Sequence, residues 1–155
     1  MSTDAFKQKK NMLVYYHGAD AKSINAIMNC GIDISRGSGE LGQGFYVGSS
    51  LWRAFSWAWM KAQNSKQTDY GVIQYEIQEQ DFLNCHLLCK NRAATTATYE
   101  NLRKSQRTKS WKSGHDAIWA PIVGKNVQHA YQIKFESQYG ELFINQQKKK
   151  IIWKK

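Results

Sequence analysis

Four glycines within eight residues constrain this 155-residue chain more than any other feature: Gly37, Gly39, Gly42 and Gly44. Glycine lets a backbone turn sharply and pass close to another group, so a loop that can lie against a ligand is predicted here. The loop leads into the apolar run 45–47, a predicted strand, and delivers Tyr46, whose ring can stack on a flat heterocycle. The segment has neither the strand–loop–helix setting of a dinucleotide-binding Rossmann turn nor the Lys-Ser/Thr pair of a phosphate-binding loop. The plainer alternative is a hairpin loop followed by a core tyrosine.

Around this loop the sequence predicts an α+β domain. Helices are expected over 21–30 with Gly31 as C-cap, over 51–63 with Ser49 or Ser50 as N-cap, and over 93–105. Strands are expected over the runs 12–16, 45–47, 71–77, 117–120, 131–135 and 141–145, while 82–88 is of uncertain type. The length suits one domain, placed at 12–147, with a flexible N-terminus at 1–11 and a basic tail at 148–155.

Basic residues outnumber acidic ones by 22 to 12, which gives a net charge of +10. Seven of the bases lie between Cys85 and Lys112, and five lysines follow Asn145. Such clusters point to a polyanionic partner, most simply nucleic acid. The predicted nucleic-acid contacts are Arg103, Lys104, Arg107 and Lys109. The alternative is a solvated face with a frayed basic tail, or a surface that attracts an acidic antitoxin protein.

Membrane and metal partners are not expected. No apolar run is long enough to cross a bilayer, and the polar N-terminus lacks a secretory signal, so a cytoplasmic location is predicted. Cys30, Cys85 and Cys89 are odd in number and lack paired spacing. Cys85 and Cys89 with His86 have no second pair of ligands at a useful distance, so the cysteines are interpreted as small buried hydrophobic residues.

The helix predicted over 51–63 is rich in aromatic residues. Trp52, Phe55 and Trp59 recur at i, i+3 and i+7, which predicts a stripe packed in the core, while Trp57 lies off that stripe. Core packing is therefore favoured over base stacking for these side chains.

His17 closes the first predicted strand, within Tyr15-Tyr16-His17-Gly18. A histidine at a strand end beside glycine can offer a ligand hydrogen bonds from both side chain and main chain. Taken alone the signal is weak, because a histidine with a purely structural role is the commoner case.

The order of these segments carries a family resemblance. His17-Gly18, a helix ending at Gly31-Ile32, a glycine-rich loop, Gly44-Phe45-Tyr46 and a helix with Ala54 and Trp57-Ala58 follow one another. This series resembles the N-terminal half of the ADP-ribosyltransferase fold, in the His-Tyr branch that diphtheria toxin and the poly-ADP-ribose polymerases share. The segments 114–121 and 131–135 are similar to the family's C-terminal strands. The resemblance covers about residues 13–144 and looks closest to small bacterial members of the family. The resemblance implies a split β-sandwich with N-terminal helices.

The resemblance also implies roles for individual residues. NAD+ would be the co-substrate, with no metal. His17 would hydrogen-bond its ribose, the backbone of Gly18 would hold the nicotinamide carboxamide, and Tyr46 would stack on the nicotinamide ring, with Gly44 and Phe45 beside it. Such chemistry, in which nicotinamide leaves and an acceptor captures the ribosyl carbon, depends on orientation and electrostatic stabilisation.

The third catalytic position departs from the family pattern, which usually places Glu on a late strand. The best match here is Gln132, in the run 128–136; a frame two residues earlier would put Ala130 there. Glu136 and Glu76 are the less favoured carboxylates. Gln can hydrogen-bond a ribose hydroxyl but cannot act as a base, which favours transfer of a single ADP-ribose.

The expected function is therefore a mono-ADP-ribosyltransferase, a glycosyltransferase that moves ADP-ribose from NAD+ to a macromolecular acceptor. Nucleic acid is the favoured acceptor, RNA first, and a toxin of a toxin–antitoxin or anti-phage system fits a compact basic chain. The alternatives are a protein-directed transferase, a non-catalytic member of the fold that binds NAD, ADP-ribose or RNA, and an NAD+ glycohydrolase.

Overall fold

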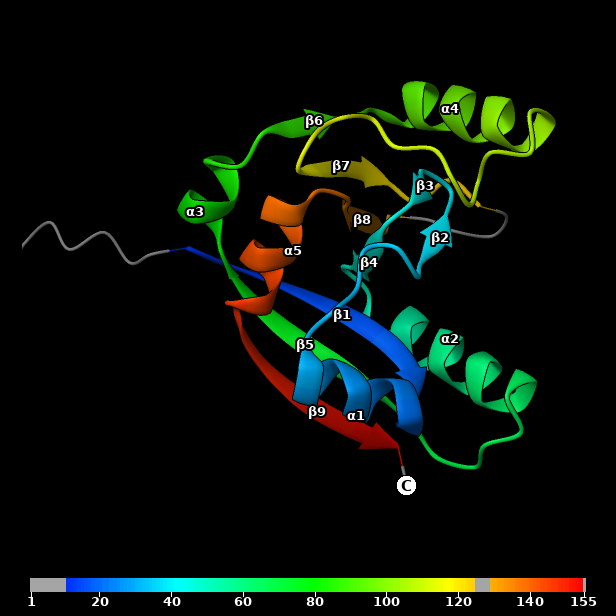
Figure 1. The fold of residues 1–155 in the computed structure, drawn as a ribbon, viewed down its shortest axis with the longest axis vertical. Helices are drawn as coiled ribbons and strands as arrows, with labels where there is room; N and C mark the ends of the chain where they lie inside the picture. The colour runs from blue at the N-terminus through cyan, green and yellow to red at the C-terminus, as the bar shows by residue number, and fades with distance from the viewer. Residues whose placement is uncertain (1–10, 125–128, 155) are drawn as a thin grey trace, which may run out of the picture.

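The computed structural model describes residues 11–124 and 129–154, and this part of the chain has an α+β fold (Figure 1). Its described elements are five helices, a mixed seven-stranded sheet and a two-stranded hairpin. The helices are α1 (Ala21–Cys30), α2 (Leu51–Asn64), α3 (Glu79–Leu83), α4 (Arg92–Lys104) and α5 (Gln138–Asn145). The sheet contains β1 (Met12–Asp20), β4 (Phe45–Gly48), β5 (Tyr70–Gln78), β6 (Leu87–Cys89), β7 (Ala117–Pro121), β8 (Tyr131–Phe135) and β9 (Lys148–Lys154), and the hairpin contains β2 (Ser38–Gly39) and β3 (Gly42–Gln43).

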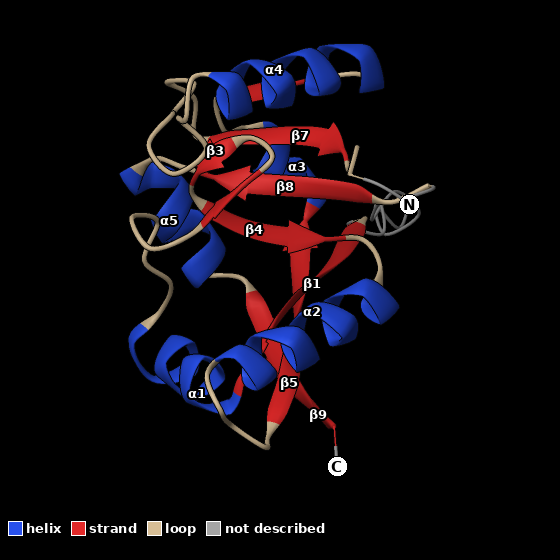
Figure 2. Ribbon diagram, turned by 90° about the vertical axis from the view of Figure 1, so that its right-hand side faces the viewer, coloured by secondary structure: helices blue, strands red, loops and turns tan. Residues whose placement is uncertain are grey.

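The sheet divides between β1 and β4. Its strand order is β6-β7-β8-β4-β1-β5-β9. β1 pairs with β5 along its whole length, but with β4 only where Tyr16 faces Gly48. From His17 onward the two strands separate, and Figure 2 shows β7, β8 and β4 inclined to β1 and β5. The middle of the sheet is therefore open on the side toward which His17 and the rest of β1 continue.

Helix α2 packs directly on the backbone of β1 beside this opening. A Cβ atom at Gly18 would lie 1.8 Å from the carbonyl oxygen of Ala54, so no larger residue fits between strand and helix. The helix comes this close because the side chains that it buries, Ala54, Ala58 and Ala62, are small. Ser50 caps the helix by accepting a hydrogen bond from the backbone N–H of Arg53.

The main core joins the sheet to α3 and α5. Phe82 of α3, Phe135 of β8 and Phe143 of α5 pack with ring centroids 6.1 to 6.2 Å apart, and all three are buried. Aromatic pairs at such separations add to the stabilisation that comes from removing apolar surface from water.

A buried ion pair connects the glycine-rich loop to β8. The ammonium group of Lys134 pairs with Glu136 and donates a hydrogen bond to the carbonyl oxygen of Leu41 at 2.6 Å. Glu136 also accepts from the backbone N–H groups of Ser113 and His115, at 2.9 and 3.1 Å. Burial alone would raise the pKa of the Glu136 carboxyl, but these donors outweigh it and hold that pKa below its usual value. Lys134, which pairs with the ionised carboxylate of Glu136, thereby ties the loop to the sheet.

Most of the expected elements are confirmed, and the boundaries of some of them are shifted by one to a few residues. The helices predicted over 21–30, 51–63 and 93–105 are α1, α2 and α4, and the strand predicted over 131–135 is β8. β1 runs past its predicted end, so His17 and Gly18 lie inside the strand. The segment 82–88, of uncertain type, is divided between α3 and β6.

Two predictions about the C-terminal part were wrong. The segment 141–145 is helical, because Ser137 caps α5 through the N–H of Gly140 and the buried residues follow helical spacing. The stretch expected as a basic tail contains β9, which pairs with Tyr70–Glu76 of β5. Lysines suit an edge strand, because their charges oppose further strand pairing. The expected flexible N-terminus lies outside the described residues except for Asn11.

Candidate functional site

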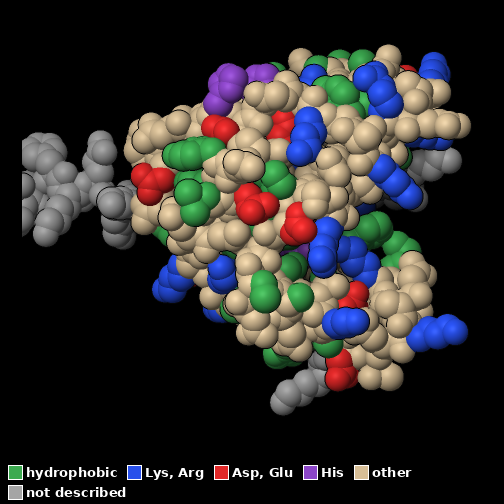
Figure 3. Space-filling view, in the orientation of Figure 1, with side chains coloured by type: hydrophobic (Ala, Val, Ile, Leu, Met, Phe, Trp, Pro, Cys, Tyr) green, Lys and Arg blue, Asp and Glu red, His purple; other side chains and the backbone are tan. Residues whose placement is uncertain are grey.

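A cleft of about 1680 Å³ occupies the opening between β1 and β4. Figure 3 shows the molecule hollowed at its right-hand side, between the part that carries α4 and the part that carries α2. β1, the β2–β3 hairpin, β4, α2 and β8 all contribute to its walls. The lining includes every residue for which NAD+ binding or catalysis was predicted: His17, Gly18, Gly44, Phe45, Tyr46 and Gln132. Residues 115 positions apart in the sequence thus meet in one cavity.

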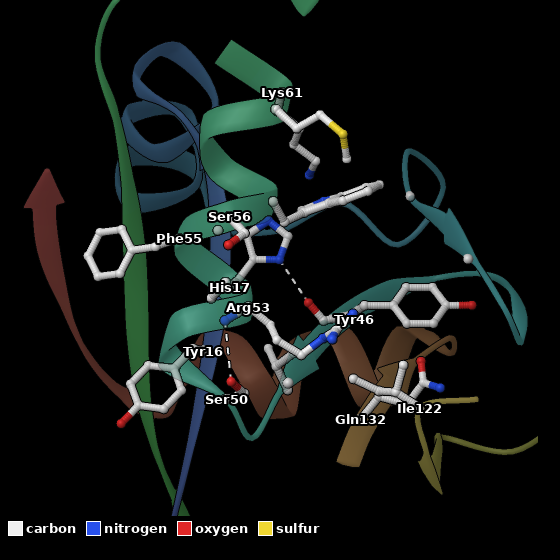
Figure 4. A pocket seen from close by; sticks show the side chains of 18 of the residues that line it. Tyr16, His17, Tyr46, Ser50, Arg53, Phe55, Ser56, Lys61, Ile122 and Gln132 are labelled. Atoms are coloured by element: carbon white, nitrogen blue, oxygen red, sulfur yellow. Dashed lines mark hydrogen bonds between the residues drawn. The ribbon is translucent and has the colours of Figure 1, made fainter. Parts of the chain in front are cut away.

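The imidazole of His17 spans the gap between the two diverging strands (Figure 4). Its Nδ1 lies 2.7 Å from the carbonyl oxygen of Tyr46. Because a carbonyl oxygen only accepts, Nδ1 carries the proton and Nε2 is left as an acceptor. The ring also packs on Phe45, with centroids 4.3 Å apart.

His17 is neutral throughout the physiological pH range. Burial lowers its pKa to about 3, and the nearby ammonium of Lys61 acts in the same direction, against the opposing effect of the hydrogen bond to Tyr46. A neutral ring with one nitrogen already donating can accept a hydrogen bond from a hydroxyl group at the other.

Tyr46 lines the same cleft, and its hydroxyl group holds the glycine-rich loop. The hydroxyl donates to the carbonyl oxygen of Gly42 at 2.6 Å and accepts from the N–H of Leu41 at 3.1 Å. A Cβ atom at Gly39 would lie 2.8 Å from the ring, so glycine is required for the loop to approach Tyr46 this closely. Burial raises the pKa of the phenol above its usual value, so Tyr46 contributes an aromatic ring and no charge.

Gln132 positions a carboxylate that the sequence analysis did not single out. Its Nε2 donates to Glu40 Oε1 at 2.9 Å and to the carbonyl oxygen of Pro121 at 3.1 Å. The same oxygen of Glu40 accepts from the backbone N–H of Val123 at 2.9 Å. Glu40 lines the cleft, whereas Gln132 is only 5% exposed. The sequence offered one indication of Glu40 as a site residue, namely a carboxylate within the glycine-rich loop. Its contact with Gln132 could not be predicted from local sequence, because the two residues are 92 positions apart.

The other carboxylates considered for the third catalytic position lie outside the cleft lining. Glu76 is on β5 and faces the ammonium of Lys148 at 3.6 Å. Glu136 is enclosed in the ion pair with Lys134. Ala130, the residue in the alternative frame, is buried and has no polar side chain.

The aromatic stripe predicted for α2 is exposed, and its assignment to the core was wrong. Trp52 is 79% exposed and Trp59 is 52% exposed, while Phe55 is half-buried. The helix buries its alanine face, because only small side chains allow the close contact at Gly18. Trp52, Trp59 and Trp57, which lay off the predicted stripe, all line the cleft.

The predicted nucleic-acid contacts do not form one surface with the C-terminal lysines. Four exposed residues, Arg103, Lys104, Arg107 and Lys109, lie at the end of α4 and in the turn that follows, outside the cleft lining. Lys148, Lys149 and Lys150 belong to β9, at the opposite edge of the sheet from β6 and β7. The two groups of basic residues therefore lie on different parts of the fold.

Only one of the three cysteines that were expected to be buried is buried. Cys85 is buried as expected, whereas Cys30 and Cys89 are exposed. Within residues 11–124 and 129–154, no three His, Cys, Asp or Glu side chains lie together as a metal site would require. In the same part of the chain, no helix has the length and apolarity that a membrane crossing needs.

Comparison with protein-family models gives no match, and comparison with curated proteins gives none either.

Proposed function

We propose that the protein is a mono-ADP-ribosyltransferase with a split β-sandwich of the ADP-ribosyltransferase type. The observation that carries the proposal is the cleft at the division of the sheet, which brings together His17, Tyr46 and Gln132. The proposal assigns ribose binding to His17, ring stacking to Tyr46 and the third catalytic position to Gln132, which lie on β1, β4 and β8.

The cleft has the groups that a dinucleotide needs. Its volume, about 1680 Å³, exceeds the roughly 300 to 1,000 Å³ of ordinary small-molecule pockets. Three basic side chains that could meet a diphosphate line it: Arg36, Arg53 and Lys61. When bound, NAD+ would supply the ribosyl carbon and nicotinamide as the leaving group.

His17 and Tyr46 would bind and orient the co-substrate. Nε2 of His17 is free to accept from a ribose hydroxyl, because Nδ1 already donates to Tyr46. The ring of Tyr46 is fixed in place through its hydroxyl group, and it is the group that would stack on the nicotinamide ring. Both groups are preorganised, so little side-chain entropy is lost when the ligand binds.

Glu40 would supply the negative charge that Gln132 lacks. The nicotinamide bond breaks with positive charge developing on the ribose, and a fixed carboxylate stabilises such charge. Gln132 and Val123 hold Oε1 of Glu40, while Oε2 has no hydrogen bond from the described residues. In this arrangement Gln132 is a positioning residue, and Glu40 is the group that can polarise an acceptor hydroxyl.

The experiment uses isotopically labelled NAD+ with the full-length protein and separate pools of RNA, DNA and protein. The proposal predicts label in a macromolecule, with nucleic acid favoured. Glu40→Gln should lose most of the transfer, whereas Glu76→Gln, a carboxylate outside the cleft, should keep it. Nicotinamide release with water as the only acceptor would identify a glycohydrolase instead. Saturable NAD+ binding without nicotinamide release would identify a non-catalytic member of the fold.

A further inference from the structure

Helix α2 exposes its large aromatic side chains and buries its small ones. Trp52 is 79% exposed, and Trp57 and Trp59 are each 52% exposed, whereas the buried face consists of Ala54, Ala58 and Ala62. A surface helix ordinarily turns its apolar stripe toward the core. Large exposed apolar groups gathered on one element mark an interaction surface more often than scattered single residues do.

The aromatic face of α2, defined as Trp52, Trp57, Trp59 and Met60, lines the same cleft as His17. Trp52 and Trp59 are seven residues apart, which places them on one side of the helix about 10 Å apart along its axis. A partner lying along this face would therefore reach the cleft in which His17 and Tyr46 lie.

Basic groups accompany the aromatic rings. The ammonium of Lys61 lies 5.6 Å from the ring centroid of Trp57, and Arg53 is exposed on the same helix. Arg36, across the cleft, is paired with Asp33 at 3.2 Å, so it adds less free charge. Glu40 is the acidic residue of the lining. Aromatic faces interleaved with basic groups suit a chain of unstacked bases and phosphates, and the +10 net charge favours an anionic partner.

We infer that the aromatic face of α2 binds a single-stranded nucleic acid and presents it to the cleft. The inference deepens the proposed function and rests on it for the role of the bound strand as acceptor. A single strand fits better than a duplex, because a duplex keeps its base faces in its own stack and leaves no ring for Trp52 or Trp59. The contacts are stacking and phosphate contacts, so the surface discriminates little among sequences.

The test measures binding of a fluorescently labelled 12-nucleotide single-stranded RNA, without NAD+, to wild type and to the double variant Trp52→Ala/Trp59→Ala. Loss of two stacked bases predicts affinity weaker by about 30-fold or more. The matched control is Trp153→Ala, since Trp153 is 42% exposed on β9 and lies outside the cleft lining. This control should bind like wild type. Arg53→Gln should lower the slope of log affinity against log salt by about 0.7, whereas the tryptophan variant should leave that slope unchanged.

Equal affinity of wild type and the double variant would overturn the inference, and so would tighter binding of the duplex form. A protein acceptor labelled in place of RNA, with RNA binding unaffected by the variants, would assign the face to a protein partner and would also overturn it. Because binding is measured without NAD+, failure of the transferase proposal gives a different result. In that case the RNA affinity still depends on Trp52 and Trp59, but wild type releases no nicotinamide.

Discussion

Lowering the pH should destabilise the protein through His17, by an amount that can be worked out. Burial, together with Lys61, lowers the pKa of this residue from 6.5 to about 3. The unfolded chain therefore binds a proton there below about pH 6.5, while the folded chain does not until about pH 3. The stability associated with neutral His17 is fully present above pH 6.5 and is lost as the pH falls. Between pH 7.5 and 5.5 this single group should lower the free energy of unfolding by about 1.3 kcal/mol.

The assay is urea unfolding of wild type and His17→Gln at both pH values. Since all other titrating groups are shared, the wild type should lose about 1.3 kcal/mol more than the variant on going to pH 5.5. His129→Asn serves as the matched control, because His129 is exposed and its positive φ of 56° suits asparagine. A second readout is the nitrogen-15 spectrum of the His17 ring, which should show a proton on Nδ1 and a neutral ring at pH 5.5.

Equal losses of stability in wild type and His17→Gln would refute this reasoning. A ring signal of His17 that titrates near pH 6.5 would do the same. Either result would mean that folded His17 takes up a second ring proton near pH 6.5, so that below this pH Nε2 would donate a hydrogen bond where the proposal needs an acceptor.

Three further predictions concern the close helix contact, the buried ion pair and the basic cluster on α4. Gly18→Ala should prevent stable folding or lower the melting temperature sharply, because its Cβ would lie 1.8 Å from a backbone oxygen of α2; Gly48→Ala, where the nearest atom is 3.7 Å away, should be tolerated. Glu136→Gln should cost about 3 to 5 kcal/mol in urea unfolding, because it leaves the buried ammonium of Lys134 without its charge partner; a loss under 1 kcal/mol would contradict the assigned pair. Substitution of Arg103, Lys104 and Arg107 by Glu should weaken nucleic-acid binding equally for all nucleotide sequences. NAD+ affinity should stay unchanged, because the three residues lie outside the cleft lining.

The sequence predicted the parts of the site that depend on order along the chain. His17, the glycine-rich loop and Tyr46 are close in sequence, and each has a local signal. His17 and Tyr46 lie in or beside predicted strands, and the loop is marked by its run of glycines. Gln132 was predicted by matching a late strand, and it lines the same cleft as His17 and Tyr46. Its partner Glu40 was missed, because their hydrogen bond joins residues 92 positions apart and local patterns carry no long-range geometry.

The orientation of α2 could not be decided from periodicity. The tryptophans and the alanines both recur at helical spacing, on opposite faces of one helix. Hydrophobicity favours burial of the tryptophans, but the contact at Gly18 admits only a small residue, and that contact depends on a strand more than 30 residues earlier. β9 could not be predicted from local sequence either. Its run of lysines is typical of a solvated tail, and it forms an edge strand because it pairs with β5.

The central claim is that NAD+ is cleaved in this cleft while its nicotinamide ring is stacked on Tyr46. The most direct test is to measure nicotinamide release by a matched pair of Tyr46 variants. Tyr46→Phe keeps the ring and loses the two hydrogen bonds that hold the loop, whereas Tyr46→Ala loses both ring and hydroxyl. With circular dichroism showing that both variants are folded, wild type should release nicotinamide, Tyr46→Phe should retain a substantial part of that rate, and Tyr46→Ala should release almost none. Turnover by folded Tyr46→Ala at the wild-type rate, or no nicotinamide release by the wild type, would contradict the account.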